Sequence, residues 1–164
     1  MRLSKEALKN HAAWEEAGIE LPKYNIDKMV RRTKDNPTWV HFGAGNLFKG
    51  FISVLQHTLL DKGKTDTGII AVKTCDLEIV DKIYKAYDNL GLLVIMNADG
   101  SLKKKVIGSV AGCLKGDVEE KDDWEKLKQI FSKPSLQMAS FTITEKGYAL
   151  FDLSGNYHPD VKLD

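Results

Sequence analysis

The sequence predicts an α/β fold, with a mostly parallel sheet flanked by helices. From residue 37 onward, short apolar runs alternate with segments of helical periodicity. The run at 68–72 is apolar throughout, which is typical of a parallel strand covered on both faces. The run at 39–42 ends in a glycine turn that leads directly into a helical pattern. Repeated strand–helix–strand order of this kind makes successive strands parallel.

Two helices are expected before the sheet. Ser4 is suited to cap a helix that runs to about Ala17, where Gly18 follows. Asn25 is suited to cap a second helix that runs to Arg32. Pro37 then excludes helix from the residue before it and precedes the first strand. We therefore expect residues 1–36 to form an N-terminal helical preface to the α/β domain at 37–164.

The α/β domain follows a regular alternation. A helix closed by Gly63 is expected from the helical spacing of its apolar residues, which are Leu47, Phe48, Phe51, Ile52, Leu55, Leu59 and Leu60. After the strand at 68–72, Asp76 is suited to cap a helix with an apolar stripe formed by Ile79, Val80, Ile83, Tyr84 and Tyr87.

The third strand is expected at 92–96. The four residues 97–100 are too few for a parallel crossover, so we expect an antiparallel hairpin with a strand at 103–110. Asp122 and Glu125 resemble a capping box for a further helix, and the last strand is expected at 136–144.

Composition limits the functional classes. The 164 residues, 43% of them hydrophobic, are enough for one buried core. A formal charge of +1 gives no sign of a nucleic-acid or membrane-surface binder. There is no apolar N-terminal leader or membrane-span-length run, so the cytoplasm is expected. Cys75 and Cys113 stand far apart and the four histidines are scattered, which predicts two free thiols and no structural metal.

The carboxyl ends of the parallel strands are where a ligand is expected. The turn after the first strand, formed by Gly43, Ala44, Gly45, Asn46 and Leu47, is suited to a pyrophosphate, because glycine lets backbone approach the ligand and a helix start offers free N–H groups. The full GxGxxG pattern is absent, since Phe48 stands at the third glycine position. A tight turn without a ligand is the alternative.

Two further segments reach the same edge. Asp76 could bind ribose hydroxyls or serve only as a helix cap, and Lys73 could meet a 2′-phosphate. Thr144 and Glu145 follow the last strand, where they could line a site or belong to an exposed loop.

Three motifs together resemble the N-terminal part of the mannitol dehydrogenase family, which includes mannonate oxidoreductases (fructuronate reductases). They are WVHFGAGNLFKG at 39–50, YDNL at 87–90 and SFTITEKGY at 140–148, and the similarity runs from about residue 37 to the end. The resemblance implies a Rossmann-like dinucleotide-binding domain with NAD or NADP as cofactor. It implies chemistry on a sugar alcohol or hexuronate, and it puts Thr144 and Glu145 near the nicotinamide.

The resemblance also implies a missing part. Family members continue into a helical substrate domain that supplies a catalytic lysine, whereas this chain stops at Asp164. We expect an N-terminal fragment or truncated product that is inactive alone and contains no catalytic residue. Lys73 stands where the family tends to have an acid, so NAD is favoured only slightly over NADP. A non-catalytic nucleotide-binding or regulatory domain and a methyltransferase-like domain are the rival interpretations.

Overall fold

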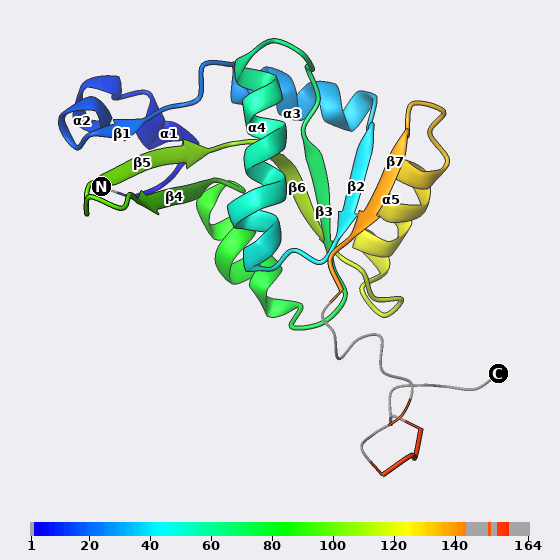
Figure 1. The fold of residues 1–164 in the computed structure, drawn as a ribbon. Coiled ribbons are helices and arrows are strands. Elements are labelled where there is room, and N and C mark those ends of the chain that lie inside the picture. The colour runs from blue at the N-terminus through cyan, green and yellow to red at the C-terminus, as the bar shows by residue number, and fades with distance from the viewer. Residues whose placement is uncertain (1, 144–150, 152–153, 158–164) are drawn as a thin grey trace.

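The computed structural model describes residues 2–143, 151 and 154–157, and it contains a parallel sheet with helices on both faces (Figure 1). The strands are β2 (Trp39–Phe42), β3 (Ile69–Lys73), β6 (Val110–Lys115) and β7 (Met138–Phe141), in the order β6-β3-β2-β7. All neighbouring pairs are parallel. Strand β2, the first of this sheet along the chain, lies inside the sheet, with β3 and β6 on one side of it and β7 on the other. This is the strand order of one half of a Rossmann sheet. The predicted fold class is confirmed.

Alternation along the buried strand β3 builds the core on both faces of this sheet. Ile69 and Ala71 pack with Phe48, which belongs to the π-helical segment η1 (Phe48–Ile52) that continues into α4 (Ser53–Asp61). The same cluster includes residues of η2 (Val80–Tyr84). Ile70 and Val72 point to the other face and pack against α5 (Lys121–Phe131). Covering both faces explains why the sequence of β3 is apolar throughout.

A smaller sheet lies beside the parallel one (Figure 1). Strands β4 (Gly91–Met96) and β5 (Leu102–Ile107) are antiparallel, which confirms the hairpin. Strand β1 (Ile19–Glu20) pairs in parallel with β5 and so connects the N-terminal segment to the hairpin. Helices α1 (Lys5–Leu8), α2 (His11–Glu16) and α3 (Ile26–Asp35) complete this part of the chain. A domain boundary at residue 36 stays a prediction.

The predicted identity of the third parallel strand was wrong. The segment 92–96 lies in the smaller sheet, and β6 is the strand that pairs with β3. The strand predicted at 103–110 is two strands, because the chain leaves the smaller sheet at Gly108-Ser109 and enters the parallel one. The Ser109 carbonyl accepts a hydrogen bond from Ile69 N (2.9 Å), so the register of β6 begins at this break.

The first predicted helix is also divided. Ser4 caps α1 as expected, accepting from Ala7 N, but the helix ends at Leu8. Asn10 caps α2 by accepting from Ala13 N, and the Trp14 indole donates to the Ala7 carbonyl at 2.8 Å. The Ala7 carbonyl also accepts from Asn10 N (3.2 Å), so an N-cap residue and an additional side-chain donor at the end of α1 stabilise the break. Helix α3 begins after Asn25, as predicted, and continues to Asp35.

Two predicted helix caps were wrong. Asp76 has φ of +48° and its carbonyl, not its side chain, accepts from Ile79 N, so η2 begins at Val80 without a side-chain cap. Helix η3 (Lys85–Tyr87) follows directly. Helix α5 begins at Lys121, which puts Asp122 inside the first turn instead of at the cap, and Glu120 at the cap makes no capping hydrogen bond.

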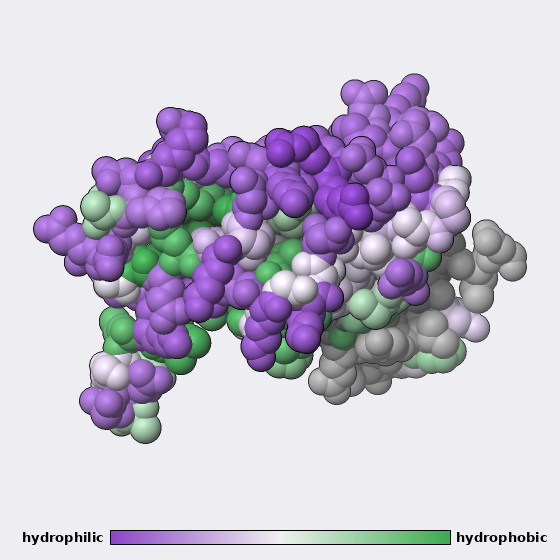
Figure 2. All heavy atoms as spheres, turned by 90° about the horizontal axis from the view of Figure 1, so that it is seen from above, coloured by the Kyte–Doolittle hydropathy of each residue, from purple (hydrophilic) through white to green (hydrophobic). Residues whose placement is uncertain are grey.

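The helix after the glycine turn buries only some of its apolar residues. Phe48 and Leu60 are buried, whereas Leu47, Phe51, Leu55 and Leu59 are exposed. Seen from above, the molecule is largely hydrophilic, and its apolar side chains gather in small areas (Figure 2). Within the described part of the chain, no helix has the length and apolar character needed to cross a membrane. Both cysteines are free, Cys75 exposed and Cys113 buried.

Candidate functional site: the glycine turn at the sheet edge

The turn after β2 is fixed by backbone hydrogen bonds. Gly43 N donates to the Val72 carbonyl of the neighbouring strand (3.0 Å), and Lys49 N donates to the Gly45 carbonyl (3.0 Å) as the helix begins. Gly43 has φ of +106°, and a Cβ there would lie 2.3 Å from Thr142 Oγ1 and 2.6 Å from the Thr142 carbonyl oxygen. The protein itself therefore requires glycine at position 43.

Gly45 is different. A Cβ at this position would meet nothing within 4 Å, and φ is not positive. The fold does not need glycine here, but the open space is what a ligand needs to approach the backbone closely. Asn46 and Leu47 are exposed next to it.

Ala44 is buried and held by a hydrogen bond from across the core. The Tyr84 hydroxyl of η2 donates to the Ala44 carbonyl at 2.9 Å. Burial raises the pKa of Tyr84, so this hydroxyl remains protonated and continues to donate. Tyr84 of η2 thus fixes the middle of the glycine turn.

A chain of polar side chains connects β2, β7 and the turn. The Thr142 hydroxyl donates to the Gly43 carbonyl (2.8 Å), so its oxygen accepts from His41 Nε2–H (3.2 Å). His41 Nδ1 must then accept from the Ser140 hydroxyl (2.8 Å), whose oxygen accepts from the Trp39 indole N–H (2.7 Å). Every donor and acceptor in this order is used once.

His41 is neutral at the centre of this chain. The side chain is fully buried and stacks on Phe48, with ring centroids 4.7 Å apart. Burial lowers the pKa of His41, which keeps one ring nitrogen as an acceptor. Sequence reasoning missed this role of His41, Ser140 and Thr142. The available signal was a histidine inside an otherwise apolar strand.

Lys73 and Asp76 lie together at the carboxyl end of β3. Lys73 Nζ is 3.9 Å from Asp76 Oδ2 and 3.8 Å from Cys75 Sγ. The Lys73 side chain is 11% exposed, against 73% for Asp76. The structure therefore presents the carboxylate to solvent and keeps most of the ammonium side chain covered. Hydrogen bonding between Gly43 N and Val72 places this segment next to the glycine turn.

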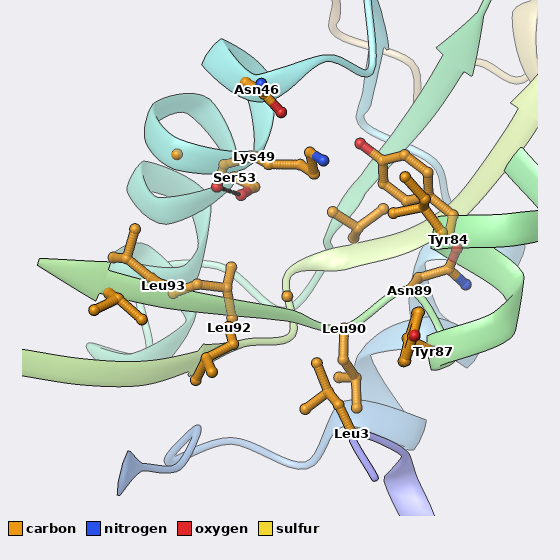
Figure 3. A pocket seen from close by; sticks show the side chains of 16 residues that line it. Leu3, Asn46, Lys49, Ser53, Tyr84, Tyr87, Asn89, Leu90, Leu92 and Leu93 are labelled. Carbon is orange, nitrogen blue, oxygen red and sulfur yellow. Dashed lines mark hydrogen bonds between the residues drawn. The ribbon is translucent and has the colours of Figure 1, made fainter. Parts of the chain in front are cut away.

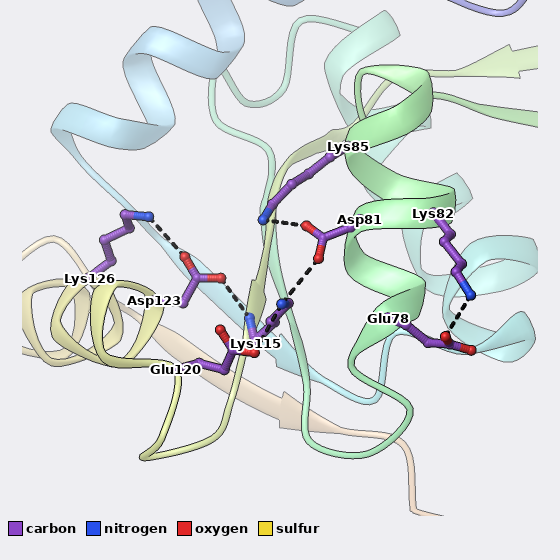
Figure 4. Close-up of polar contacts among 8 residues, drawn as sticks. All are labelled: Glu78, Asp81, Lys82, Lys85, Lys115, Glu120, Asp123 and Lys126. Atoms are coloured by element: carbon purple, nitrogen blue, oxygen red, sulfur yellow. Dashed lines mark hydrogen bonds and ion pairs between the residues drawn. The ribbon is translucent and has the colours of Figure 1, made fainter.

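A network of charged side chains lies at the carboxyl end of β6, next to the end of β3 (Figure 4). Lys115 Nζ lies 3.1 Å from Asp81 of η2 and 3.0 Å from Glu120 beside α5. Lys85 also pairs with Asp81 at 2.8 Å, and together these ammonium groups lower the pKa of Asp81. The charges at this end of the sheet are paired with one another and connect η2 to the start of α5.

Thr144 and Glu145 lie outside the described residues. The strand that leads to them, β7, ends at Phe141, directly beside β2. Of the predicted site residues, the structure brings the segment 43–47 together with Lys73 and Asp76.

Comparisons with known proteins identify relatives of the chain. The chain is 48% identical over all of its 164 residues to D-mannonate oxidoreductase of Thermotoga maritima (strain ATCC 43589 / DSM 3109 / JCM 10099 / NBRC 100826 / MSB8). The chain is homologous to D-mannonate oxidoreductase. The match confirms the resemblance inferred from the sequence motifs, and it spans 30% of that relative's length. No protein-family model matches the chain.

Solved structures show the same fold. A D-sorbitol dehydrogenase in substrate-free form superposes with a TM-score of 0.73 at 24% identity, covering 96% of this chain and 30% of that one. A ternary complex of Pseudomonas fluorescens mannitol 2-dehydrogenase with NAD and D-mannitol gives a TM-score of 0.72 at 21% identity, again over 96% and 30%. The described chain shares its Rossmann-like architecture with these two dehydrogenases.

Proposed function

We propose that this chain is the cofactor-binding part of an NAD(P)-dependent oxidoreductase that acts on a sugar alcohol or a hexuronate. The position of the glycine turn carries the proposal. Strands β3 and β6 lie on one side of β2 and β7 lies on the other, so the turn after β2 stands where the strand order reverses. Dinucleotides bind in the crevice at such a point. The 48% identity to D-mannonate oxidoreductase supports the substrate class.

The residues present fit a dinucleotide. The backbone of Gly43 to Leu47 would hold the pyrophosphate, because no Cβ covers Gly45 and the helix start supplies N–H groups. Asp76 would bind the adenosine ribose, and Thr144 and Glu145 remain candidates for the nicotinamide end. When bound, the nicotinamide supplies hydride transfer at a secondary carbon. The role of this chain is to bind and orient the cofactor, and the proposed compartment is the cytoplasm.

NAD is the proposed cofactor over NADP. An exposed carboxylate at the end of the second strand is suited to ribose hydroxyls and repels a 2′-phosphate. Lys73 would favour the 2′-phosphate, but its side chain is largely covered and lies against Asp76. Asp76→Asn should therefore narrow the preference for NADH over NADPH.

Calorimetric titration with NADH, NADPH and S-adenosylmethionine tests the proposal. We expect saturable binding of NADH, weaker binding of NADPH, no binding of S-adenosylmethionine, and no turnover of D-mannonate or mannitol by this chain alone. Gly45→Val should abolish NADH binding and leave thermal stability unchanged, since its side chain enters open space. Unaltered NADH affinity in this variant would refute the pyrophosphate assignment. Binding of S-adenosylmethionine alone would favour a methyltransferase.

A further inference from the structure

A cavity of about 480 Å³ lies near the start of the helix that follows the glycine turn (Figure 3). It is enclosed by η1 and α4, by η2 and η3, and by strand β4. Its walls are mainly apolar, formed by Leu3, Ile83, Leu90, Leu92, Leu93, Val94, Ile107 and Val110. Ile83, Tyr87, Leu92 and Val94 in this lining are 39–50% exposed. The volume falls within the range of small-molecule sites, roughly 300–1,000 Å³. Large apolar side chains therefore surround an open hollow.

Few polar groups converge on this cavity, and they are of specific kinds. Lys49 extends from η1 toward Tyr84 (Figure 3), and Nζ has no hydrogen-bond or ion-pair partner in the described part of the chain. No acidic residue occurs among the described residues that line the cavity. Among the described residues, the cavity thus presents one unpaired cation within apolar walls.

We propose that this cavity binds a small amphipathic anion, with an apolar chain and a terminal carboxylate. The apolar chain would cover Ile83, Leu92 and Val94, whose exposure otherwise costs free energy. The carboxylate would pair with Lys49. Asn46 and Tyr84 are shared with the glycine turn, but the proposal depends on Lys49 and the apolar walls and does not rest on the proposed function.

Calorimetric titration with three eight-carbon compounds tests the chemistry of the site. The probes are octanoate, 1-octanol and octylamine, which share the alkyl chain and differ in the charge of the head group. We expect one octanoate per chain to bind. Octanol should bind about tenfold more weakly than octanoate, the loss expected for one charge-assisted hydrogen bond. Octylamine should not bind.

Two variants locate the site. Lys49→Met removes the charge and shortens the side chain by one atom, so octanoate should bind this variant no more tightly than octanol does. Gly50→Leu adds a bulky side chain to the lining without a clash at Cβ, because a Cβ at Gly50 meets nothing within 4 Å, and it should abolish binding of octanoate and octanol. Gly112→Leu is the matched control: it is equally free of contacts, lies on β6 outside this cavity, and should bind octanoate like the parent chain.

Several outcomes would overturn the proposal. These are the absence of saturable octanoate binding at millimolar concentrations, equal affinity for octanoate and octylamine, or binding that survives Gly50→Leu in a variant with the parent melting temperature. If the parent chain sedimented as a larger species than the Gly50→Leu variant, a second copy of the chain would fill the cavity. That result would also overturn it.

Discussion

At the residue scale, the two glycines of the turn have different reasons to be glycine. Gly43 combines a positive φ with a close approach to Thr142, so the fold depends on it. Gly45 has neither feature, and the proposed pyrophosphate contact is the reason that we offer for the missing side chain. The sequence identified both residues as one motif but could not separate these roles, because the contact to Thr142 depends on a strand about a hundred residues later.

Gly43→Ala should lower the free energy of unfolding by about 2 kcal/mol or more, since it adds a left-handed alanine and a steric overlap. Gly45→Ala is the matched control and should unfold like the parent chain or slightly later. Urea denaturation followed by circular dichroism measures both. Equal midpoints for the two variants would contradict the assignment of Gly43 to the fold.

His57 gives the stability a defined pH dependence. The side chain is fully buried, with Nε2 3.3 Å from Asp61 Oδ2 and Nδ1 2.9 Å from the Tyr24 hydroxyl. Burial lowers the pKa of His57 from 6.5 to about 4. The unfolded chain therefore binds more protons between these values, and the contribution is complete above pH 6.5 and is lost as pH falls toward 4.

The free energy of unfolding, measured by urea denaturation at a series of pH values, should show this contribution, which amounts to about 3 kcal/mol. In His57→Gln the free energy of unfolding should fall less steeply between pH 6.5 and 4, because glutamine does not titrate. The exposed His11→Gln is the control and should follow the parent curve. The same slope in all three proteins would mean that His57 does not hold the depressed pKa.

At the element scale, β2 and β7 are joined by side chains as well as by the backbone ladder. The chain from Trp39 through Ser140, His41 and Thr142 ends on the Gly43 carbonyl, and so couples the strand pair to the conformation of the turn. Each side chain donates to the next, so removal of Ser140 or of the Thr142 hydroxyl leaves the preceding donor without an acceptor.

Thr142→Val should therefore destabilise the chain by about 2 kcal/mol, because it leaves His41 Nε2–H without its acceptor, whereas the Gly43 carbonyl keeps its hydrogen bond from Gly45 N (2.8 Å). Thr142→Ser retains the hydroxyl and should lose much less. Thermal and urea unfolding of the two variants give the comparison. If serine were as destabilising as valine, packing of the threonine methyl group, and not the hydrogen-bond chain, would be responsible.

Sequence patterns predicted elements where local chemistry decides them. The buried strand at 68–72, the hairpin around 97–100 and the turn at 43–45 depend on apolar runs, chain length and glycine, and all are present. Strand β6 was missed because Gly108-Ser109 is only a short interruption between two strands in the sequence. The two strands are distinguished by the sheets to which they belong, which the local sequence does not show. The role of His41 was missed for a similar reason, since its partners on β7 are about a hundred residues away.

At the scale of the whole molecule, the described part of the chain exposes two apolar surfaces besides the cavity beside η1. The helical segment exposes Leu47, Phe51, Leu55 and Leu59 at a spacing of four residues, which places them along one stripe. In the described part of the chain β7 pairs only with β2, and its Met138 and Phe141 are 43% and 59% exposed. Parallel strands are normally covered on both faces, and apolar patches of this kind favour association.

The chain should therefore self-associate reversibly, and Leu55→Lys should weaken that association by placing a charge in the exposed stripe. Leu55 is 48% exposed, so the substitution leaves the core in place and the melting temperature should change little. Val118→Lys adds the same charge at a 59% exposed site between β6 and α5 and is the control. Sedimentation velocity over a concentration series separates the outcomes. Weaker association in the Leu55 variant alone would locate the contact on the helix, whereas equal association in all three proteins would exclude the exposed stripe of the helix as the contact surface.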